Sequence, residues 1–291
     1  MQLKKVRLPN GETYAYREAG QGNKVLVLIH GNMSSSLWWD VLIEELKDED
    51  KKIYAIDLRG FGESSYNNPI KSINDLTLDI KLFADAVGIS GFTIAGLSLG
   101  GSVAMGFTVD YPEYVSKLIL IAPGPARGIR LHRRDAAGQI IPGEYVDSKK
   151  DIEEYNRHFL NYYATRNYSA LKKAYDEAVW NVNKPDPKRY QAYIEESCKQ
   201  RCKIDVDWAV INYNISHEHN GFVAGSGEVD RITCPVLVLI GDKDKAITME
   251  MAESTVKDIG ENARLIVMPE TAHAPFEDSL DLIADEIRKF V

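Results

Sequence analysis

Short apolar runs alternate with amphipathic segments along most of the chain, and this alternation constrains the fold more than any other feature. Continuous apolar runs are typical of strands that are buried on both faces of a parallel sheet. Such runs occupy residues 24–31, 51–60, 92–96, 116–124, 234–242 and 263–270. Segments with helical spacing of apolar residues lie between or after them, at 36–48, 72–89, 98–112, 248–260 and 279–291. Residues 2–20 predict two further strands around a Pro-Asn-Gly turn. We therefore expect an α/β fold with a mostly parallel central sheet and helices on both faces.

The alternation stops between residues 124 and 231. This segment has no buried-strand run and shows helical spacing, for example in 150–164 and 169–180. It also holds nine of the fifteen tyrosines and two of the four tryptophans. Ligands of open α/β sheets bind at the carboxyl ends of the strands. We therefore expect a core formed by residues 1–123 and 232–291, with residues 124–231 inserted as a helical lid over that edge.

Charge and cysteine content restrict the partners of the protein. The net charge is −8, whereas a nucleic-acid partner requires clustered basic residues. The three cysteines, Cys198, Cys202 and Cys234, form no disulfide framework and no zinc-like ligand spacing. The N-terminus lacks the apolar core of a signal peptide, and no run approaches the roughly 18 apolar residues of a membrane span. We expect a cytoplasmic protein with no metal, cofactor, nucleic-acid or membrane partner; the sequence does not indicate its oligomeric state.

A serine between two glycines is the strongest chemical signal. Gly96-Leu97-Ser98-Leu99-Gly100 follows an expected strand and opens an expected helix. In that context a Gly-x-Ser-x-Gly motif forms a tight turn that exposes the serine hydroxyl at a helix N-terminus. The free amides of the helix favour developing negative charge there. Ser98 is therefore our candidate nucleophile.

The partners of such a serine are an acid and a histidine, in that order along the chain. Asp242 and Asp244 follow the expected strand at 234–242, and His273 follows the strand at 263–270. Each candidate therefore lies at the carboxyl end of a separate strand. The pattern predicts a Ser-Asp-His triad with either aspartate as its acid.

Six segments together resemble the α/β-hydrolase superfamily over nearly the full length of the chain. They are LIHGNMSSSLWWD, AIDLRGFGES, IAGLSLGGSVAM, YPEYVSKLILIAP, CPVLVLIGDKD and ETAHAPFED. The resemblance implies an α/β-hydrolase fold and places the acid three residues after Gly241, at Asp244. It also implies an oxyanion hole formed by the main-chain amides of Leu99 and Asn32, with Met33 as the alternative to Asn32. His30 is implied to be structural.

Aromatic residues of the expected lid are candidates for an apolar acyl pocket. They are Trp180, Trp208, Tyr162 and Tyr163, and we add Met33 from the loop after the first buried strand. Aromatic residues at helical spacing also form the core of a helical segment, so both interpretations stay open. The number of aromatic residues favours a bulky substrate.

The His-Gly-Asn segment with a nearby tryptophan is also similar to haloalkane dehalogenases, which, like epoxide hydrolases, use an aspartate nucleophile. Here Ser98 stands at the nucleophile position and Leu99, not tryptophan, follows it. Both activities are therefore excluded from our expectation.

We predict a serine hydrolase that cleaves carboxylic esters through an acyl-enzyme. The alternatives are a lactonase for acyl-homoserine or macrocyclic lactones, which the resemblance also allows, a carbon–carbon bond hydrolase, and a ligand receptor with slow turnover.

Overall fold

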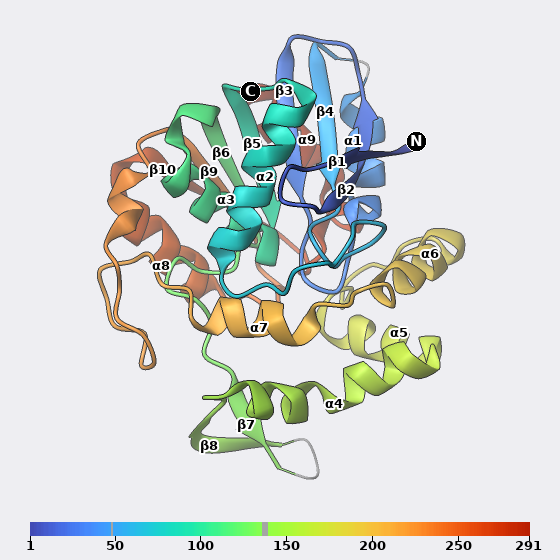
Figure 1. Cartoon of the computed structure of the whole chain (residues 1–291), viewed down its shortest axis with the longest axis vertical. Coiled ribbons are helices and arrows are strands. Elements are labelled where there is room, and N and C mark those ends of the chain that lie inside the picture. Colours follow the sequence, from blue (N-terminus) through green and yellow to red (C-terminus); the bar gives the residue numbers. More distant parts are fainter. Residues whose placement is uncertain (48, 136–138) are drawn as a thin grey trace.

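The computed structural model describes residues 1–47, 49–135 and 139–291 and contains a central eight-stranded sheet (Figure 1). The order of strands across the sheet is β1-β2-β4-β3-β5-β6-β9-β10. β1 pairs antiparallel with β2 and β2 antiparallel with β4, whereas all other neighbours are parallel. The strands are β1 (Leu3–Arg7), β2 (Thr13–Ala19), β3 (Lys24–Ile29), β4 (Lys51–Ile56), β5 (Phe92–Leu97), β6 (Val115–Ile121), β9 (Val236–Gly241) and β10 (Ala263–Met268). The expected mostly parallel sheet is confirmed.

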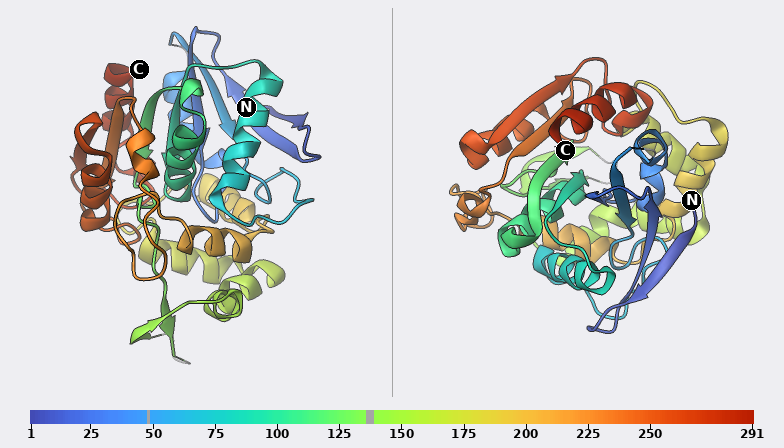
Figure 2. Two further views of the ribbon diagram at one scale, coloured as in Figure 1. Left: turned by 60° about the vertical axis from the view of Figure 1, so that its left-hand side comes forward. Right: turned by 90° about the horizontal axis from the view of Figure 1, so that it is seen from above.

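Helices cover both faces of the sheet, as its apolar strands require (Figure 2). Alternate residues of one strand enter different cores: Val27 and Ile29 pack with α2 (Ile73–Val87) and α3 (Leu99–Asp110). Their neighbours Leu26 and Leu28 pack on the other face with α1 (Asp40–Leu46) and α9 (Leu280–Phe290). α8 (Met249–Ile259) contacts β9 and β10. Short 3₁₀ helices span Ser36–Trp39, Pro112–Tyr114, Glu228–Arg231, Gly260–Asn262 and Pro275–Glu277.

Local signals set the ends of the helices that flank the candidate nucleophile. Ser72 caps α2 in a capping box with Asp75. The side chain of each residue accepts a hydrogen bond from the main-chain amide of the other. The helix ends at Gly88, which adopts φ 73°. α3 ends at Asp110, two residues before Pro112, because proline cannot continue a helix.

Among the described residues, four α-helices between β6 and β9 lie beyond the carboxyl ends of the parallel strands (Figure 1). They are α4 (Lys149–Thr165), α5 (Tyr168–Ala178), α6 (Pro187–Ser197) and α7 (Lys203–Ile211). The segment is not helical throughout, because β7 (His132–Arg134) and β8 (Ile140–Tyr145) form a separate two-stranded sheet that the expectation of a helical lid did not include. β8 is exposed along most of its length, so it lacks the apolar run by which a buried strand is recognised.

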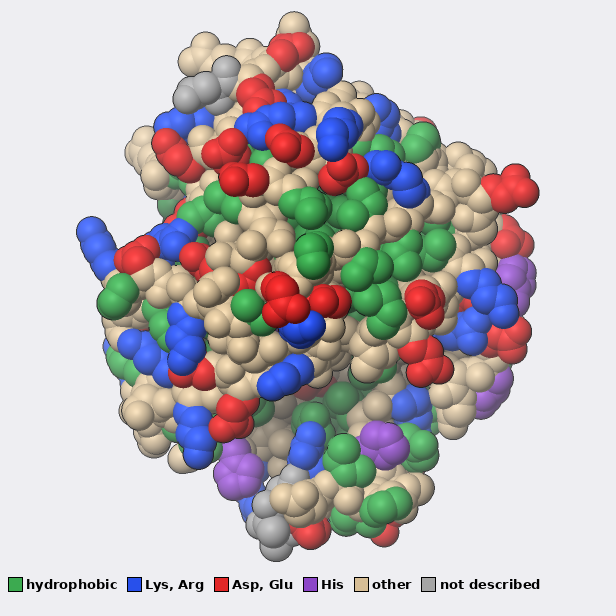
Figure 3. All heavy atoms as spheres, turned by 180° about the vertical axis from the view of Figure 1, so that it is seen from behind, with side chains coloured by type: hydrophobic (Ala, Val, Ile, Leu, Met, Phe, Trp, Pro, Cys, Tyr) green, Lys and Arg blue, Asp and Glu red, His purple; other side chains and the backbone are tan. Residues whose placement is uncertain are grey.

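The surface in Figure 3 mixes acidic and basic side chains around small apolar areas. No helix of the described chain is long and apolar enough to cross a membrane. Cys198, Cys202 and Cys234 are unpaired.

Candidate active site

Ser98 occupies a strained turn between β5 and α3. Its backbone adopts φ 54° and ψ −119°, a conformation that L-residues rarely take. Its amide donates to the carbonyl of Ile121 at 3.1 Å, and its carbonyl accepts from the amides of Gly101 and Gly124, both at 2.8 Å. These main-chain hydrogen bonds, one to α3 and two to the end of β6 and the loop after it, hold the turn. Ser98 as a whole remains partly exposed and lines a cavity.

The two motif glycines are required because main-chain atoms approach them closely. A Cβ on Gly96 would lie 2.1 Å from the carbonyl oxygen of Gly100. A Cβ on Gly100 would lie 2.1 Å from the carbonyl oxygen of Ile29, at the end of β3. The motif thus brings the nucleophile turn against the loop that follows β3.

Asp244 and His273 form a buried pair after β9 and β10. Nδ1 of His273 lies 2.9 Å from Oδ2 of Asp244, and the two side chains are 10% and 1% exposed. Oδ1 of Asp244 accepts the amides of Ala246 and Ile247, each at 2.8 Å. The carboxylate is therefore held in place and oriented toward the imidazole.

Asp242, the other acidic candidate, points elsewhere. Its Oδ1 accepts the amide of Thr271 at 3.2 Å, and its Oδ2 pairs with Lys243 at 3.2 Å. It makes no hydrogen bond to His273 within the described residues. The carboxylate that meets the histidine is thus that of Asp244.

Ser98 follows β5 and His273 follows β10, so both lie at the carboxyl edge of the sheet. Among the described residues, no hydrogen bond joins the Ser98 hydroxyl to His273. The structure therefore pairs the histidine with the acid and leaves the hydroxyl unbonded. Hydrogen bonds of a catalytic base are often long in ligand-free enzymes and shorten when substrate binds.

Leu99 and Asn32 flank Ser98 in the wall of one cavity. Leu99 is the first residue of α3, so its amide has no partner within the helix. The Asn32 side chain makes three hydrogen bonds: Nδ2 donates to Asp207 at 2.8 Å, and Oδ1 accepts from Gln200 at 2.9 Å and from the Met33 amide at 3.0 Å. Helix α7 and the residues before it thereby fix the loop that would supply the second oxyanion amide.

Met33 adopts φ 58° in the same loop. Its carbonyl accepts the hydroxyls of Tyr175 and Ser197 at 2.6 and 2.7 Å. These bonds come from α5 and α6, so three of the four inserted helices or their ends contact this loop.

His30 is a structural residue. It is completely buried, and its Nδ1 lies 2.7 Å from the carbonyl of Gly31 while its Nε2 accepts the amide of Leu58 at 3.0 Å. Burial lowers the pKa of His30 below its ordinary value. Both ring nitrogens are thus occupied beneath the site.

A cavity of about 220 Å³ opens onto Ser98. Residues of the core and of the inserted helices line it: Asn32, Met33, Ser98, Leu99, Ser102, Gly124, Ile129, Leu131, Tyr155, Asn156, Phe159, Lys203, Asp207, Val210 and Ile211. Of the five residues expected to bind substrate, this lining includes Met33.

The other four candidates pack in apolar clusters, and Trp180 also contacts Trp38 of the core, with ring centroids 4.7 Å apart. Trp180 is 2% exposed and stacks on Tyr193 with ring centroids 6.0 Å apart. Tyr163 is buried in the same apolar cluster, against which Tyr162 packs. Trp208 contacts Phe222 edge-on. These aromatic residues lie outside the cavity lining.

Sequence reasoning missed the polar residues of the cavity wall, above all Asn156, Lys203 and Asp207. One signal was available: Lys203 and Asp207 stand four apart in α7, whose other inward residues are largely apolar. Their spacing places both on one face of the helix.

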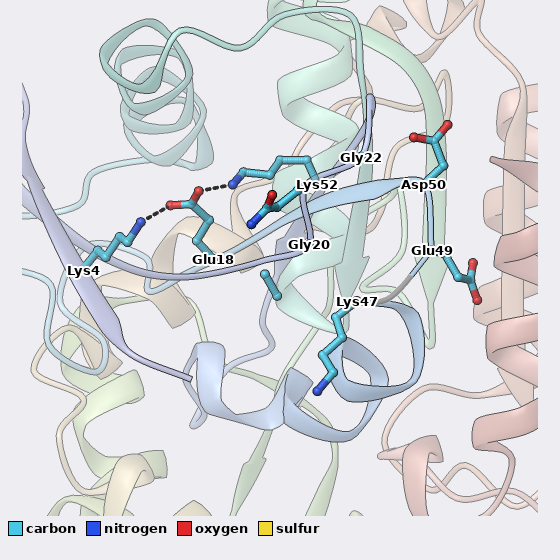
Figure 4. Close-up of a pocket in the computed structure, with 10 residues that line it drawn as sticks. Lys4, Glu18, Gly20, Gly22, Lys47, Glu49, Asp50 and Lys52 are labelled. Carbon is cyan, nitrogen blue, oxygen red and sulfur yellow. Dashed lines mark hydrogen bonds and ion pairs between the residues drawn. The ribbon is translucent and has the colours of Figure 1, made fainter.

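A larger cavity of about 770 Å³ lies at the other end of the parallel strands, where β3 and β4 begin (Figure 4). Charged side chains line it, and Glu18 pairs there with Lys4 and Lys52. It is remote from the strand ends that carry Ser98, Asp244 and His273.

A family model described as "alpha/beta hydrolase fold" matches residues 24–280. The chain belongs to the α/β-hydrolase family. Relatives of this α/β hydrolase differ in their named activities. Epoxide hydrolase 4 of Mus musculus is 26% identical over 286 residues, covering 97% of this chain and 77% of the relative. A pimeloyl-[acyl-carrier protein] methyl ester esterase of Vibrio vulnificus is 23% identical, covering 90% of this chain and 91% of the relative.

Solved structures agree on the fold of this α/β hydrolase. An esterase from Exiguobacterium antarcticum superposes with a TM-score of 0.77 at 19% identity, and the match covers 99% of both chains. The expected α/β-hydrolase fold is thereby confirmed, and the family makes the chain a hydrolase.

Proposed function

We propose that this α/β hydrolase is a carboxylic ester hydrolase with Ser98 as nucleophile, His273 as base and Asp244 as the acid of the triad. The observation that carries the proposal is the 2.9 Å bond between His273 and Asp244, at the sheet edge where the strained turn exposes Ser98. A carboxylate on Nδ1 keeps the proton there, so Nε2 is free to accept one.

The proposed reaction begins when Nε2 of His273 removes the proton of the Ser98 hydroxyl and Oγ attacks the ester carbonyl carbon. The amides of Leu99 and Asn32 hydrogen-bond the oxyanion of the tetrahedral intermediate. Collapse breaks the bond to the alkoxy oxygen, which takes the proton from His273 and leaves as the alcohol. A water that His273 deprotonates then attacks the acyl-enzyme and releases the carboxylic acid.

Residues 124–231 act in this proposal as a lid over the core of residues 1–123 and 232–291. Support comes from α4 and α7, which supply much of the cavity wall next to Ser98. The cavity of about 220 Å³ lies below the usual 300–1,000 Å³ of sites for drug-sized ligands. That volume favours a short or medium, largely apolar acyl group over the bulky ester expected from the aromatic content.

The identity of the residue at the nucleophile position favours ester over epoxide hydrolysis. One relative is named as an epoxide hydrolase, and others are named as a lipase and a methyl ester esterase. Epoxide hydrolases of this family use an aspartate nucleophile, whereas this chain has Ser98 at that position. A serine alkoxide suits acyl transfer to water.

The test is hydrolysis of p-nitrophenyl esters from acetate to dodecanoate by the wild type and by Ser98→Ala. We expect repeated turnover with an optimum at a short or medium chain, and loss of turnover in the variant. An acyl-homoserine lactone and a macrocyclic lactone are assayed alongside. Turnover of a lactone alone would replace the esterase by a lactonase, and a single equivalent of product per protein would favour a receptor.

A further inference from the structure

A buried ion pair stands in the wall of the cavity that opens onto Ser98. Nζ of Lys203 lies 2.6 Å from Oδ2 of Asp207, and each side chain is 7% exposed. Both residues line the cavity. Removing two charges from water costs several kcal/mol per ion, so such a pair contributes little to stability. Its place in the wall of the same cavity as Ser98 points to a role in binding.

The two partners of this pair differ in how many hydrogen bonds they make. Asp207 accepts three: from Lys203 at 2.6 Å, from Asn156 at 2.7 Å and from Asn32 at 2.8 Å. An ammonium carries three N–H donors. Within the described part of the chain, Lys203 uses one of them, on Asp207. The carboxylate is therefore well satisfied, while the ammonium keeps two donors for a ligand.

The charge balance selects the kind of group that these donors take. Asp207 already compensates the charge of Lys203, and Lys203 is the one cationic side chain among the described residues of the cavity wall. A substrate carboxylate there would add a buried negative charge without a counterion, which is costly. A neutral oxygen of a ketone, hydroxyl or ether satisfies the donors without that cost.

The remaining wall defines the rest of the ligand. Apolar side chains form much of it: Ile129, Leu131, Phe159, Val210 and Ile211. A substrate in this cavity would present its ester to Ser98, apolar carbon atoms to these side chains and an oxygen to Lys203.

We propose that Lys203, held by Asp207, is a specificity-determining residue that donates a hydrogen bond to a second, neutral oxygen carried by the ester substrate. The inference rests on the proposed ester hydrolysis and names its substrate class: oxo- or hydroxy-substituted esters of short or medium length. Asp207 is a positioning residue, since it orients Lys203 and also holds Asn32.

The experiment compares kcat/KM for p-nitrophenyl hexanoate with that for its 4-oxo and 5-oxo derivatives. A second series compares butyrate esters of simple alcohols with those of matching hydroxy-alcohols, so that an oxygen on either side of the ester is sampled. Hydrogen bonds to a charged group are worth enough for a preference of roughly 10-fold or more for one oxygenated member. Lys203→Met should bring that ratio close to one.

Lys199→Met is the matched control, because Lys199 lies four residues earlier, between α6 and α7 and outside the cavity lining, and pairs with Glu63 and Glu196. It should keep the wild-type ratio. Lys203→Met leaves Asp207 without its cation, so the double variant Lys203→Met with Asp207→Asn is also measured; it removes both charges and should lose the preference as well.

Equal kcat/KM for plain and oxygenated esters in the wild type would overturn the proposal, as would a preference that survives in both Lys203 variants. Failure of the proposed function is a different result, namely no turnover of any ester. In that case the affinities of Ser98→Ala for hexanamide and 5-oxohexanamide, measured by calorimetry, decide the matter: tighter binding of the oxo-amide supports the subsite, and equal binding overturns it.

Discussion

Nδ1 of His273 lies 2.9 Å from Oδ2 of Asp244, while the other carboxylate oxygen accepts two main-chain amides. Three hydrogen bonds therefore fix one carboxylate against one imidazole. Asp242, two residues earlier, bonds Thr271 and Lys243 instead. This difference between neighbouring aspartates allows a sharp test of which one serves the triad.

Asp244→Asn should lower kcat by about 10³- to 10⁴-fold, because an amide in this position favours the wrong imidazole tautomer. Asp242→Asn should leave kcat within about threefold of the wild type, because among the described residues that carboxylate bonds Thr271 and Lys243 and makes no hydrogen bond to His273. Steady-state kinetics on one p-nitrophenyl ester measures both. Equal losses in the two variants would remove Asp244 from its proposed role.

Replacing Ser98 by glycine should separate stability from activity. Ser98 adopts φ 54°, where a side chain costs of order 1–3 kcal/mol. Ser98→Gly should therefore raise the free energy of unfolding by about 1 kcal/mol relative to Ser98→Ala, although both lack the hydroxyl and are inactive. Urea unfolding of the two variants provides the comparison. A less stable glycine variant would mean that the turn is not strained.

Two glycines of α3 should respond very differently to a methyl group. In Gly100→Ala the new Cβ would lie 2.1 Å from the main-chain oxygen of Ile29, so we expect a loss of at least about 3 kcal/mol. In Gly106→Ala it meets side-chain methyl groups of Ile73 and Thr77 at 3.1 and 3.3 Å, which can adjust. That variant should stay within about 1 kcal/mol of the wild type. Similar losses in thermal unfolding would contradict the close approach at Gly100.

Burial of neutral His30 should make the protein less stable in mild acid. Its pKa is lowered in the folded state, so the unfolded chain binds the proton more readily. Stability that is present above about pH 6.5 is then lost as the pH falls below that value, by up to about 1.4 kcal/mol per pH unit. His30→Gln should flatten the dependence of unfolding free energy on pH between 5 and 7.

His217→Gln is the control for that measurement. Asp230 raises the pKa of exposed His217, so its removal should steepen the same dependence slightly. If His30→Gln left the dependence unchanged, His30 would not be held neutral by burial.

The strands and the ends that carry Ser98, Asp244 and His273 are predictable from sequence because each strand is a continuous apolar run followed by polar residues or glycine. The choice between Asp242 and Asp244 does not follow from spacing alone. Both follow the same strand, and their directions depend on the turn between Gly241 and Ile247.

The cavity wall is less predictable, because it depends on how inserted helices cross the sheet edge. Trp180 and Tyr163 are candidates by composition but are buried in an apolar cluster shared with the core, where Trp180 contacts Trp38. Lys203 and Asp207 are charged, and charged residues are usually exposed. Their burial arises only when α7 packs near α4 and the loop after β3. The exposed β7–β8 hairpin is unpredicted for the opposite reason, as it buries no apolar face.

The most direct test of the central claim is covalent labelling of the nucleophile. The wild type is treated with a fluorophosphonate, which reacts with activated serine hydroxyls, and the adduct is located by peptide mass spectrometry. We predict one adduct per chain, on Ser98, with none in Ser98→Ala and slow formation in His273→Ala. Absence of an adduct, or an adduct on another residue, would contradict Ser98 as the nucleophile of this α/β hydrolase.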